Sequence, residues 1–252
     1  MRFIMMGDTR RNTHYADKPN EDYYCFNQSR GFALVLDGVT RSRQGACYPN
    51  PSPSRIVSEA FADAAGNVLT APDEMRAEAR LALAARQGNA AVAQKNQDFP
   101  SAFLPGTVGV LALFDDAGLH YAYIGDSNGI LISAGKLMPF TYPQTEAVHR
   151  RRSEFTTDEI RTYICNNAEH PCGYGVWNGQ PGALCFLRIG TLPLSAGDRV
   201  LLCTDGLNPF LDSISESKLA NLDSTSLLQR AMAFEAAGWM DDRTAIIVEA
   251  QE

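Results

Sequence analysis

Four acidic turns in this chain border hydrophobic runs that are typical of β-strands. Three follow such a run and one opens a run; they are Asp37-Gly38, Asp126-Ser127, Asp205-Gly206 and Asp241-Asp242. Carboxylate and carbonyl oxygens at strand ends are the ligands that hard divalent cations prefer. A single Asp-Gly pair is common in ordinary turns. The joint occurrence of four acidic turns at strand-like runs therefore indicates a metal centre built from carboxylates.

Two further acids, Glu21 and Asp22, complete the candidate acidic set. Gathering several carboxylates in one cleft is costly unless a cation neutralises them or their pKa values rise. Two divalent ions about 4 Å apart, bridged by a carboxylate and a water, would resolve that cost and create a nucleophile for attack on a phosphate ester. The chain lacks the Gly-x-Ser-x-Gly, His-Glu-x-x-His and P-loop motifs of other hydrolases and nucleotide enzymes.

Composition describes an ordinary globular protein. The 252 residues are 45% hydrophobic and 20% charged, which fits one domain spanning residues 1–252. The net charge of −7 argues against nucleic acid as a partner. The apolar start of the chain is too short for a signal peptide, and no run of eighteen apolar residues occurs. We therefore expect a cytoplasmic protein without a membrane partner; the oligomeric state is not predicted.

The order of expected elements favours two antiparallel sheets over a parallel one. Strands and a hairpin come early, a pair of helices follows, and further strands and a late helix complete the chain. The expected helices cover residues 56–64, 72–95, 157–164 and 224–237, and the expected strands cover 23–26, 32–36, 108–114, 120–124, 129–133, 199–203 and 244–248. We expect Thr70 or Asp73 to cap the second helix, and Thr156 with Glu159 to form a capping box for the third. The predicted fold class is α+β, with packed antiparallel sheets covered by helices.

Six motifs in this order resemble a known family. They are Asn20-Glu21-Asp22, Leu36-Asp37-Gly38, Gly106-Thr107, Gly125-Asp126-Ser127, Thr204-Asp205-Gly206-Leu207 and Asp241-Asp-Arg-Thr244. The series resembles the metal-dependent type 2C (PPM) protein serine/threonine phosphatases, in their bacterial form, over about residues 8–250. The resemblance implies a four-layer α/β/β/α sandwich and hydrolysis of phosphoserine or phosphothreonine in proteins with two Mn²⁺ or Mg²⁺ ions.

The resemblance also implies a role for each acidic residue. Asp37 would bridge the two metals, with the Gly38 carbonyl on one of them, and Asp205 and Asp241 would hold the other. Asp126 would serve a third, weaker metal site. Glu21 and Asp22 would orient metal-bound waters. Asp37, Asp205 and Asp241 are therefore the expected catalytic residues, and Thr107 is expected to support the site.

The phosphate-binding group is where this chain departs from the family pattern. The family often places an arginine shortly before the Asn-Glu-Asp motif, whereas the nearest cation here is Lys18, one position away. A lysine offers a point charge rather than a bidentate fork. Lys18, Arg41 and Arg43 are the candidates, with Arg10 and Arg11 as further alternatives. Val39 replaces a histidine found in many eukaryotic members, and Asp242 replaces the usual asparagine.

Residues 140–186 are expected to form a surface flap that sets substrate choice, with Arg150 to Arg152 and Trp177 contacting a phosphoprotein or packing locally. The implied partner is a phosphoprotein made by an opposing serine/threonine kinase. Two other functions stay open. One is a catalytically silent relative that senses or binds a partner, although Asp37, Asp205 and Asp241 are all retained. The other is a hydrolase of small phosphate esters.

Overall fold

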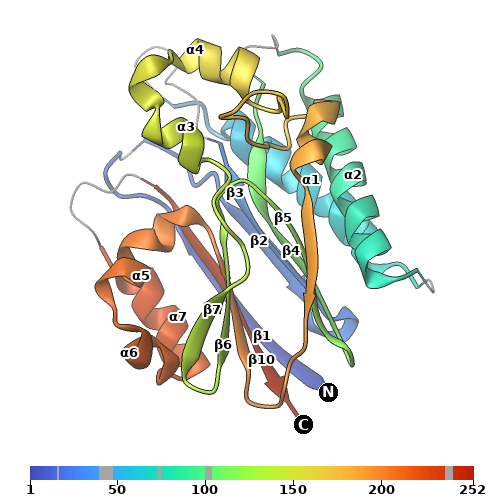
Figure 1. The fold of residues 1–252 in the computed structure, drawn as a ribbon, viewed down its shortest axis with the longest axis vertical. Helices are drawn as coiled ribbons and strands as arrows, with labels where there is room; N and C mark the ends of the chain where they lie inside the picture. The colour runs from blue at the N-terminus through green and yellow to red at the C-terminus, as the bar shows by residue number, and fades with distance from the viewer. Residues whose placement is uncertain (16, 40–47, 73–74, 100–103, 236–240) are drawn as a thin grey trace.

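Two five-stranded antiparallel sheets lie face to face at the centre of the molecule, and helices cover the outer face of each sheet (Figure 1). The computed structural model describes residues 1–252 apart from 16, 40–47, 73–74, 100–103 and 236–240. The layers run helices, sheet, sheet, helices. The predicted α/β/β/α sandwich is thereby confirmed.

The two sheets draw their strands from different parts of the chain. In the first, the strand order is β1 (Arg2–Arg10), β10 (Arg243–Gln251), β9 (Arg199–Cys203), β6 (Asn128–Ser133) and β7 (Lys136–Pro139). In the second, it is β2 (Tyr23–Asn27), β3 (Phe32–Gly38), β4 (Thr107–Asp115), β5 (Gly118–Ile124) and β8 (Arg188–Leu192). Strand β1 pairs along its whole length with β10, from Arg2 opposite Gln251 to Arg10 opposite Arg243. Strands β1, β7 and β8 are not among the strands predicted from the sequence.

The outer layers are two groups of helices. The antiparallel pair α1 (Pro53–Thr70) and α2 (Ala77–Lys95) covers the second sheet. The short helices α5 (Asn208–Ser213), α6 (Glu216–Ala220) and α7 (Ser224–Ala233) cover the first. A third group, α3 (Glu146–Arg150), α4 (Thr157–Glu159) and a π-helical turn (Ile160–Ile164), lies over one end of the sandwich. Within the described residues, no helix combines the length and apolar character needed to cross a bilayer.

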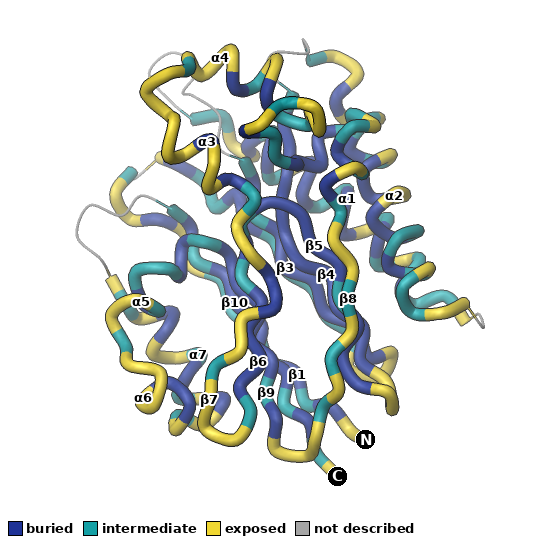
Figure 2. Tube along the Cα trace, viewed as in Figure 1, coloured by how far each residue is buried: buried dark blue, intermediate teal, exposed yellow. Residues whose placement is uncertain are grey.

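The central strands are buried on both faces (Figure 2). In β3, Leu34 and Leu36 pack under α1 and α2, while Ala33 and Val35 pack between the sheets. Successive side chains of a strand point to opposite faces, so a strand with two covered faces needs an unbroken apolar run. This explains why β3 and β4 show no polar alternation in the sequence. Their register also brings Asp37 and Gly38 to the sheet end beside Val108 and Thr107.

Two expected helix features are wrong. Helix α2 begins at Ala77, not at Pro72; Thr70 is the last residue of α1, and its hydroxyl donates to the Gly66 carbonyl at 2.8 Å. The other proposed cap, Asp73, lies outside the described residues. Ile56, placed on the buried face of the first helix, is 37% exposed, whereas Val57 and Phe61 are buried. The capping box of Thr156 and Glu159 is present as predicted.

Candidate metal centre

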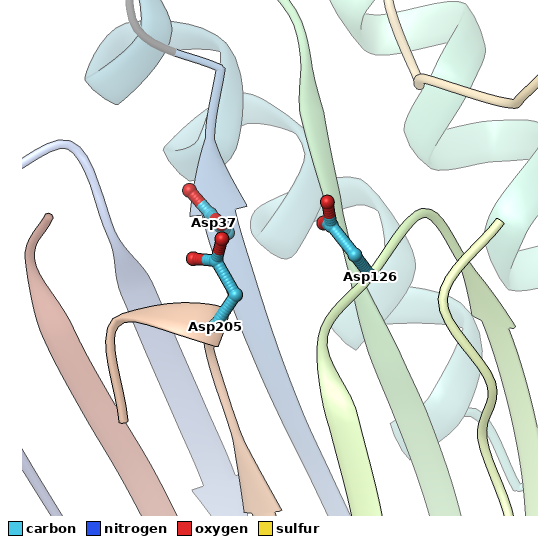
Figure 3. Close-up of side chains that lie close together, drawn as sticks. All are labelled: Asp37, Asp126 and Asp205. Carbon is cyan, nitrogen blue, oxygen red and sulfur yellow. The ribbon is translucent and has the colours of Figure 1, made fainter. Parts of the chain in front are cut away.

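Three of the predicted aspartates meet at one end of the sandwich. Asp37 lies near the end of β3, Asp126 in the turn after β5, and Asp205 just after β9, and one carboxylate oxygen of each lies within 4.8 Å of the others. The side chains of Asp37 and Asp205 point toward each other, and Asp126 faces them from a neighbouring turn (Figure 3). Because β3 and β5 belong to one sheet and β9 to the other, the cluster bridges the two sheets.

Buried hydroxyls and close backbone contacts fix the position of Asp37. The Thr107 hydroxyl donates to the Asp37 carbonyl at 2.8 Å and accepts from the Ser58 hydroxyl at 3.0 Å. Gly38 has to be a glycine here, because a Cβ atom would overlap the Glu21 backbone carbonyl. These contacts tie the end of β3 to helix α1 and to strand β4. Thr107 therefore supports the site, as the sequence predicted.

Burial and mutual repulsion make the acidic cluster hard to ionise without a cation. Burial, and then the neighbouring carboxylates of Asp205 and Asp22, raise the pKa of Asp37 well above its usual range. Burial raises the pKa of Asp205 to about 7, and the carboxylates of Asp241 and Asp126 act in the same direction. Burial also raises the pKa of Asp126, although a hydrogen bond from Thr145 at 3.0 Å opposes the shift.

These residues fit a divalent cation. The Oδ1 atom of Asp205 is buried and has no hydrogen-bond partner, which is costly for a carboxylate oxygen unless an ion binds it. Oxygen ligands lie about 2.0–2.6 Å from Mg²⁺ or Ca²⁺, so two ligands of one ion can be separated by up to about 5 Å. The 4.8 Å spacing of Asp37, Asp126 and Asp205 is within that range.

Asp22 and Glu21 form a buried second layer behind the cluster. Asp22 is 1% exposed and accepts a hydrogen bond from the Thr204 hydroxyl at 2.8 Å. The same Thr204 oxygen accepts from the Thr244 backbone N–H at 3.1 Å. This short chain of hydrogen bonds joins the start of β2 to the end of β9 and the start of β10. The predicted role of Glu21 and Asp22 in orienting metal-bound waters stays a prediction.

Asp241 and Asp242 take different positions although they are adjacent. Asp242 is 1% exposed, and its two carboxylate oxygens accept the backbone N–H groups of Asn12 at 2.7 Å and Glu21 at 2.9 Å. Asp241 lines the same pocket as Asp37 and Asp126, and its carboxylate lies 3.8 Å from the Lys18 ammonium. Asp241 thus lines the pocket, and Asp242 organises the backbone. Asp241 is not one of the three aspartates whose oxygens lie within 4.8 Å of one another, and its role as a metal ligand stays a prediction.

A pocket of about 410 Å³ opens over the carboxylates. Asp37, Asp126 and Asp241 form one part of its wall, and the segment at residues 145–178 forms much of the rest. This segment contributes cationic, aromatic and thiol groups as well as apolar ones, namely Val148, His149, Arg152, Ile160, Arg161, Cys165, Tyr174 and Val176. The site therefore has an anionic floor and cationic residues along its upper wall.

The flap is held together by the side-chain amide of Asn166 and is joined to the body of the protein by a backbone bridge at Trp177. Asn166 Nδ2 donates to the Val176 carbonyl at 2.9 Å, and Asn166 Oδ1 accepts from the Val176 N–H at 2.8 Å. Trp177 is fully buried, stacks on Phe61 with ring centroids 4.2 Å apart, and exchanges two backbone hydrogen bonds with Thr107. Trp177 is therefore a packing residue. Of the two alternatives, contact with a phosphoprotein and local packing, the structure favours packing.

The predicted phosphate-binding residues receive little support. Arg41 and Arg43 lie outside the described residues. The Lys18 side chain is 3% exposed and is surrounded by carboxylates, so a phosphate contact is not favoured. Of Arg150, Arg151 and Arg152, Arg152 lines the pocket, and the neighbouring His149 lines it as well. Arg161, which also lines it, is not predicted from the sequence, because no spacing rule links an irregular flap to distant strand ends.

The sequence is also similar to those of known proteins. A family model described as protein phosphatase 2C matches residues 11–241. The serine/threonine protein phosphatase PstP of Mycobacterium tuberculosis is 28% identical over 171 residues, which are 68% of this chain and 32% of PstP. The chain thus spans about a third of the length of the curated relatives it matches.

Solved structures share the whole fold. The crystal structure of the M. tuberculosis phosphatase PstP/Ppp superposes with a TM-score of 0.72 at 21% identity and covers 100% of both chains. The PstP catalytic domain in complex with two manganese ions gives 0.69 at 22% identity and covers 99% of both. The phosphatase MsPP from Mycobacterium smegmatis, in complex with cacodylate, gives 0.65 at 19% identity and 98% coverage. At these identities the likeness concerns the fold.

Proposed function

Because this chain belongs to the protein phosphatase 2C family, we propose that it is a metal-dependent protein serine/threonine phosphatase. The observation that carries the proposal is the convergence of Asp37, Asp126 and Asp205 within 4.8 Å, with a buried Asp205 oxygen that lacks a partner. The whole-length fold match to a catalytic domain that holds two manganese ions supports two Mn²⁺ or Mg²⁺ ions here as well.

In this proposal, Asp37 and the Gly38 carbonyl hold one ion, Asp205 and Asp241 join Asp37 in holding the other, and Asp126 serves a third. Bound ions would neutralise the carboxylates, polarise a phosphoryl oxygen and lower the pKa of water so that it can attack phosphorus. Glu21 and Asp22 fix the ligands from behind. The buried Thr107 hydroxyl holds the backbone of Asp37 in position.

The flap residues Arg152 and Arg161 are the proposed contacts for the substrate's phosphate or its acidic neighbours. Both line the pocket above the carboxylates, and a guanidinium can form two parallel hydrogen bonds to a phosphate. Apolar side chains such as Val39, Val148 and Ile160 would contact the peptide around the phosphorylated residue. A phosphoprotein substrate and an opposing serine/threonine kinase follow from this proposal. The five described cysteines are free thiols, which suits the proposed cytoplasmic location.

One assay series tests the reaction. Hydrolysis of p-nitrophenyl phosphate and of a phosphothreonine peptide should require Mn²⁺ or Mg²⁺ and stop in chelator. Asp205→Asn should lower kcat by at least about 100-fold, since a bound ion contributes several kcal/mol to the transition state. Asp212→Asn, on the exposed surface of α5, is the matched control. Full activity in chelator would refute the proposal.

The same assays separate the alternatives. A silent relative would bind Mn²⁺ yet hydrolyse neither compound, and a small-ester hydrolase would cleave p-nitrophenyl phosphate but no phosphopeptide. Phosphotyrosine peptide cleaved as well as phosphothreonine peptide would contradict the assigned specificity.

The flap contact has a separate test. Arg161→Met should raise KM for a phosphopeptide by about tenfold while leaving Mn²⁺ affinity unchanged, because the lost group binds substrate rather than metal. Arg150→Met is the matched control, because Arg150 is exposed and paired with Glu146 on the surface. Equal KM values for Arg161→Met and the wild type would remove Arg161 from the substrate site.

A further inference from the structure

Lys18 places a buried cation inside the acidic region. Its ammonium lies 3.6 Å from a Glu21 oxygen, 3.8 Å from an Asp241 oxygen and 3.5 Å from an Asp242 oxygen. The side chain is 3% exposed. Lysine is almost never buried to this extent unless it is paired. Three carboxylates around one ammonium meet that condition.

The three carboxylates belong to segments that are far apart in the chain. Glu21 precedes β2, and Asp241 and Asp242 precede β10. Asp242 already accepts two backbone N–H groups, from Asn12 and Glu21, so the position of its carboxylate is fixed. Lys18 therefore joins the loop before β2 to the loop before β10. Removing one partner of a buried ion pair leaves an uncompensated charge, which is strongly destabilising.

Lys18 reaches only the rear of the centre. It is not among the residues that line the pocket over Asp37 and Asp126, whereas its ion-pair partner Asp241 is. A phosphate in the pocket would meet the metal ligands before it met this ammonium. A positive charge beside a metal ligand repels a divalent cation, and the repulsion is strong where water is excluded.

We propose that Lys18 is a resident counter-cation of the centre, which holds Asp241 and Asp242 in place when no metal is bound and thereby weakens divalent-cation binding. Lys18 is a positioning residue in this sense, since it acts on the metal ligands rather than on substrate. The affinity part of the proposal rests on the proposed metal-dependent function. The stability part concerns the metal-free protein and stands without it.

Lys18→Met, which keeps the length of the side chain and removes its charge, tests both parts. Calorimetric titration with Mn²⁺ should show at least about tenfold tighter binding to Lys18→Met than to the wild type, because the repulsion is gone. Thermal unfolding in chelator should show a midpoint lower by about 5–10 °C, because Asp242 and Glu21 lose their cation. Lys18→Arg, which keeps the charge, should stay near the wild type in both measurements.

Lys136→Met is the matched control, since Lys136 is exposed at the hairpin of β6 and β7. Should Lys18→Met fold only with Mn²⁺ present, the ion would be replacing the lost cation, which supports the proposal. Lys18→Gln, uncharged but polar, provides a second variant for the titration.

Unchanged Mn²⁺ affinity together with unchanged stability in chelator would overturn the proposal. The proposal would also be overturned if Lys18→Met had unchanged Mn²⁺ affinity but was inhibited more weakly by inorganic phosphate. That result is expected if Lys18 contacts phosphate. A wild-type protein that binds no Mn²⁺ would refute the proposed function, and the unfolding experiment in chelator would still decide whether Lys18 is a structural counter-cation.

Discussion

Burial and the neighbouring carboxylates of Asp241 and Asp126 all favour the protonated form of Asp205. Its pKa is raised to about 7 in the folded protein, from an ordinary value of 3.8. The folded state therefore binds more protons than the unfolded state between these values, so stability falls as pH rises. Asp37 and Asp22 have raised pKa values and act in the same direction.

We therefore expect the metal-free protein to lose stability between about pH 4 and pH 7, in contrast to a protein with ordinary salt-bridged carboxylates. In chelator at pH 8, Asp205→Asn should be more stable than the wild type by up to about 4 kcal/mol, and the two should converge below pH 4. Urea unfolding at several pH values measures this. A wild type that gains stability from pH 5 to pH 8 in chelator would contradict it.

Gly206 shows how closely the two aspartate turns of the first sheet approach. A Cβ atom at this position would overlap the Asp242 backbone carbonyl oxygen. Gly206→Ala should therefore cost about 1–3 kcal/mol of stability and weaken Mn²⁺ binding, because Asp205 and Asp241 adjoin the displaced segment. Gly66→Ala, where the nearest atom is 3.9 Å away inside helix α1, should be neutral or slightly stabilising. Equal stability of both variants would refute this account.

At the residue scale, the sequence predicted the acidic turns well, because Asp beside Gly at a strand end has a local signature. It did not predict the ion pairs of Lys18, because they join the chain before β2 to the chain before β10. Two departures from the family pattern, Lys18 and Asp242, lie 3.5 Å apart in the folded protein. They form one contact, which the spacing of the two residues along the chain does not reveal.

At the scale of elements, the flap depends on one asparagine in an unusual conformation. Asn166 has a φ of 60°, in the left-handed region, and binds both the N–H and the carbonyl of Val176. Its amide also donates to the side-chain oxygens of Asn178 and Gln180 at 2.8 and 3.2 Å. A single side chain thus joins the two halves of the flap.

Asn166→Ala should cost about 1–3 kcal/mol, because buried polar partners lose their hydrogen bonds. It should raise KM for a phosphopeptide more than it changes Mn²⁺ affinity, since the flap carries the substrate contacts and the aspartates do not depend on it. Hydrogen exchange should quicken in residues 166–180. Asn67→Ala, on the exposed face of α1, is the control. A loss of Mn²⁺ binding equal to the loss of substrate binding would contradict the separation of roles.

Sequence periodicity placed the central strands because they are continuous apolar runs, but it could not place short edge strands. Strand β8 is largely exposed and shows no clear alternation, and β7 has only four residues. The start of α2 was missed for a different reason: Pro72 and Asp73 suit a first helical turn, yet α2 begins only at Ala77.

At the scale of the whole molecule, the two sheets supply the centre jointly. Asp37 and Asp126 lie at the ends of β3 and β5 of one sheet, and Asp205, after β9, and Asp241, before the start of β10, belong to the other. A bound ion would therefore connect the sheets. The folded state alone offers this site, since the four residues are far apart along the chain.

Mn²⁺ should accordingly raise the free energy of unfolding by about 2.7 kcal/mol per site at a hundredfold excess over Kd, and the unfolding midpoint should rise with Mn²⁺ concentration. Asp205→Asn should remove most of the shift, and Asp212→Asn should retain it. Calorimetric scans over a range of Mn²⁺ concentrations measure this. A shift of equal size in Asp205→Asn would mean that the ion binds elsewhere.

The buried Trp177 gives the protein an optical reporter at the junction between flap and centre. The chain has two tryptophans, Trp177 and Trp239, so Trp239→Phe leaves a single indole, which stacks on Phe61. The Trp177 backbone exchanges two hydrogen bonds with the backbone of Thr107, whose hydroxyl donates to the Asp37 carbonyl. The emission of this indole should therefore report motion of the flap relative to the end of β3 without any added label.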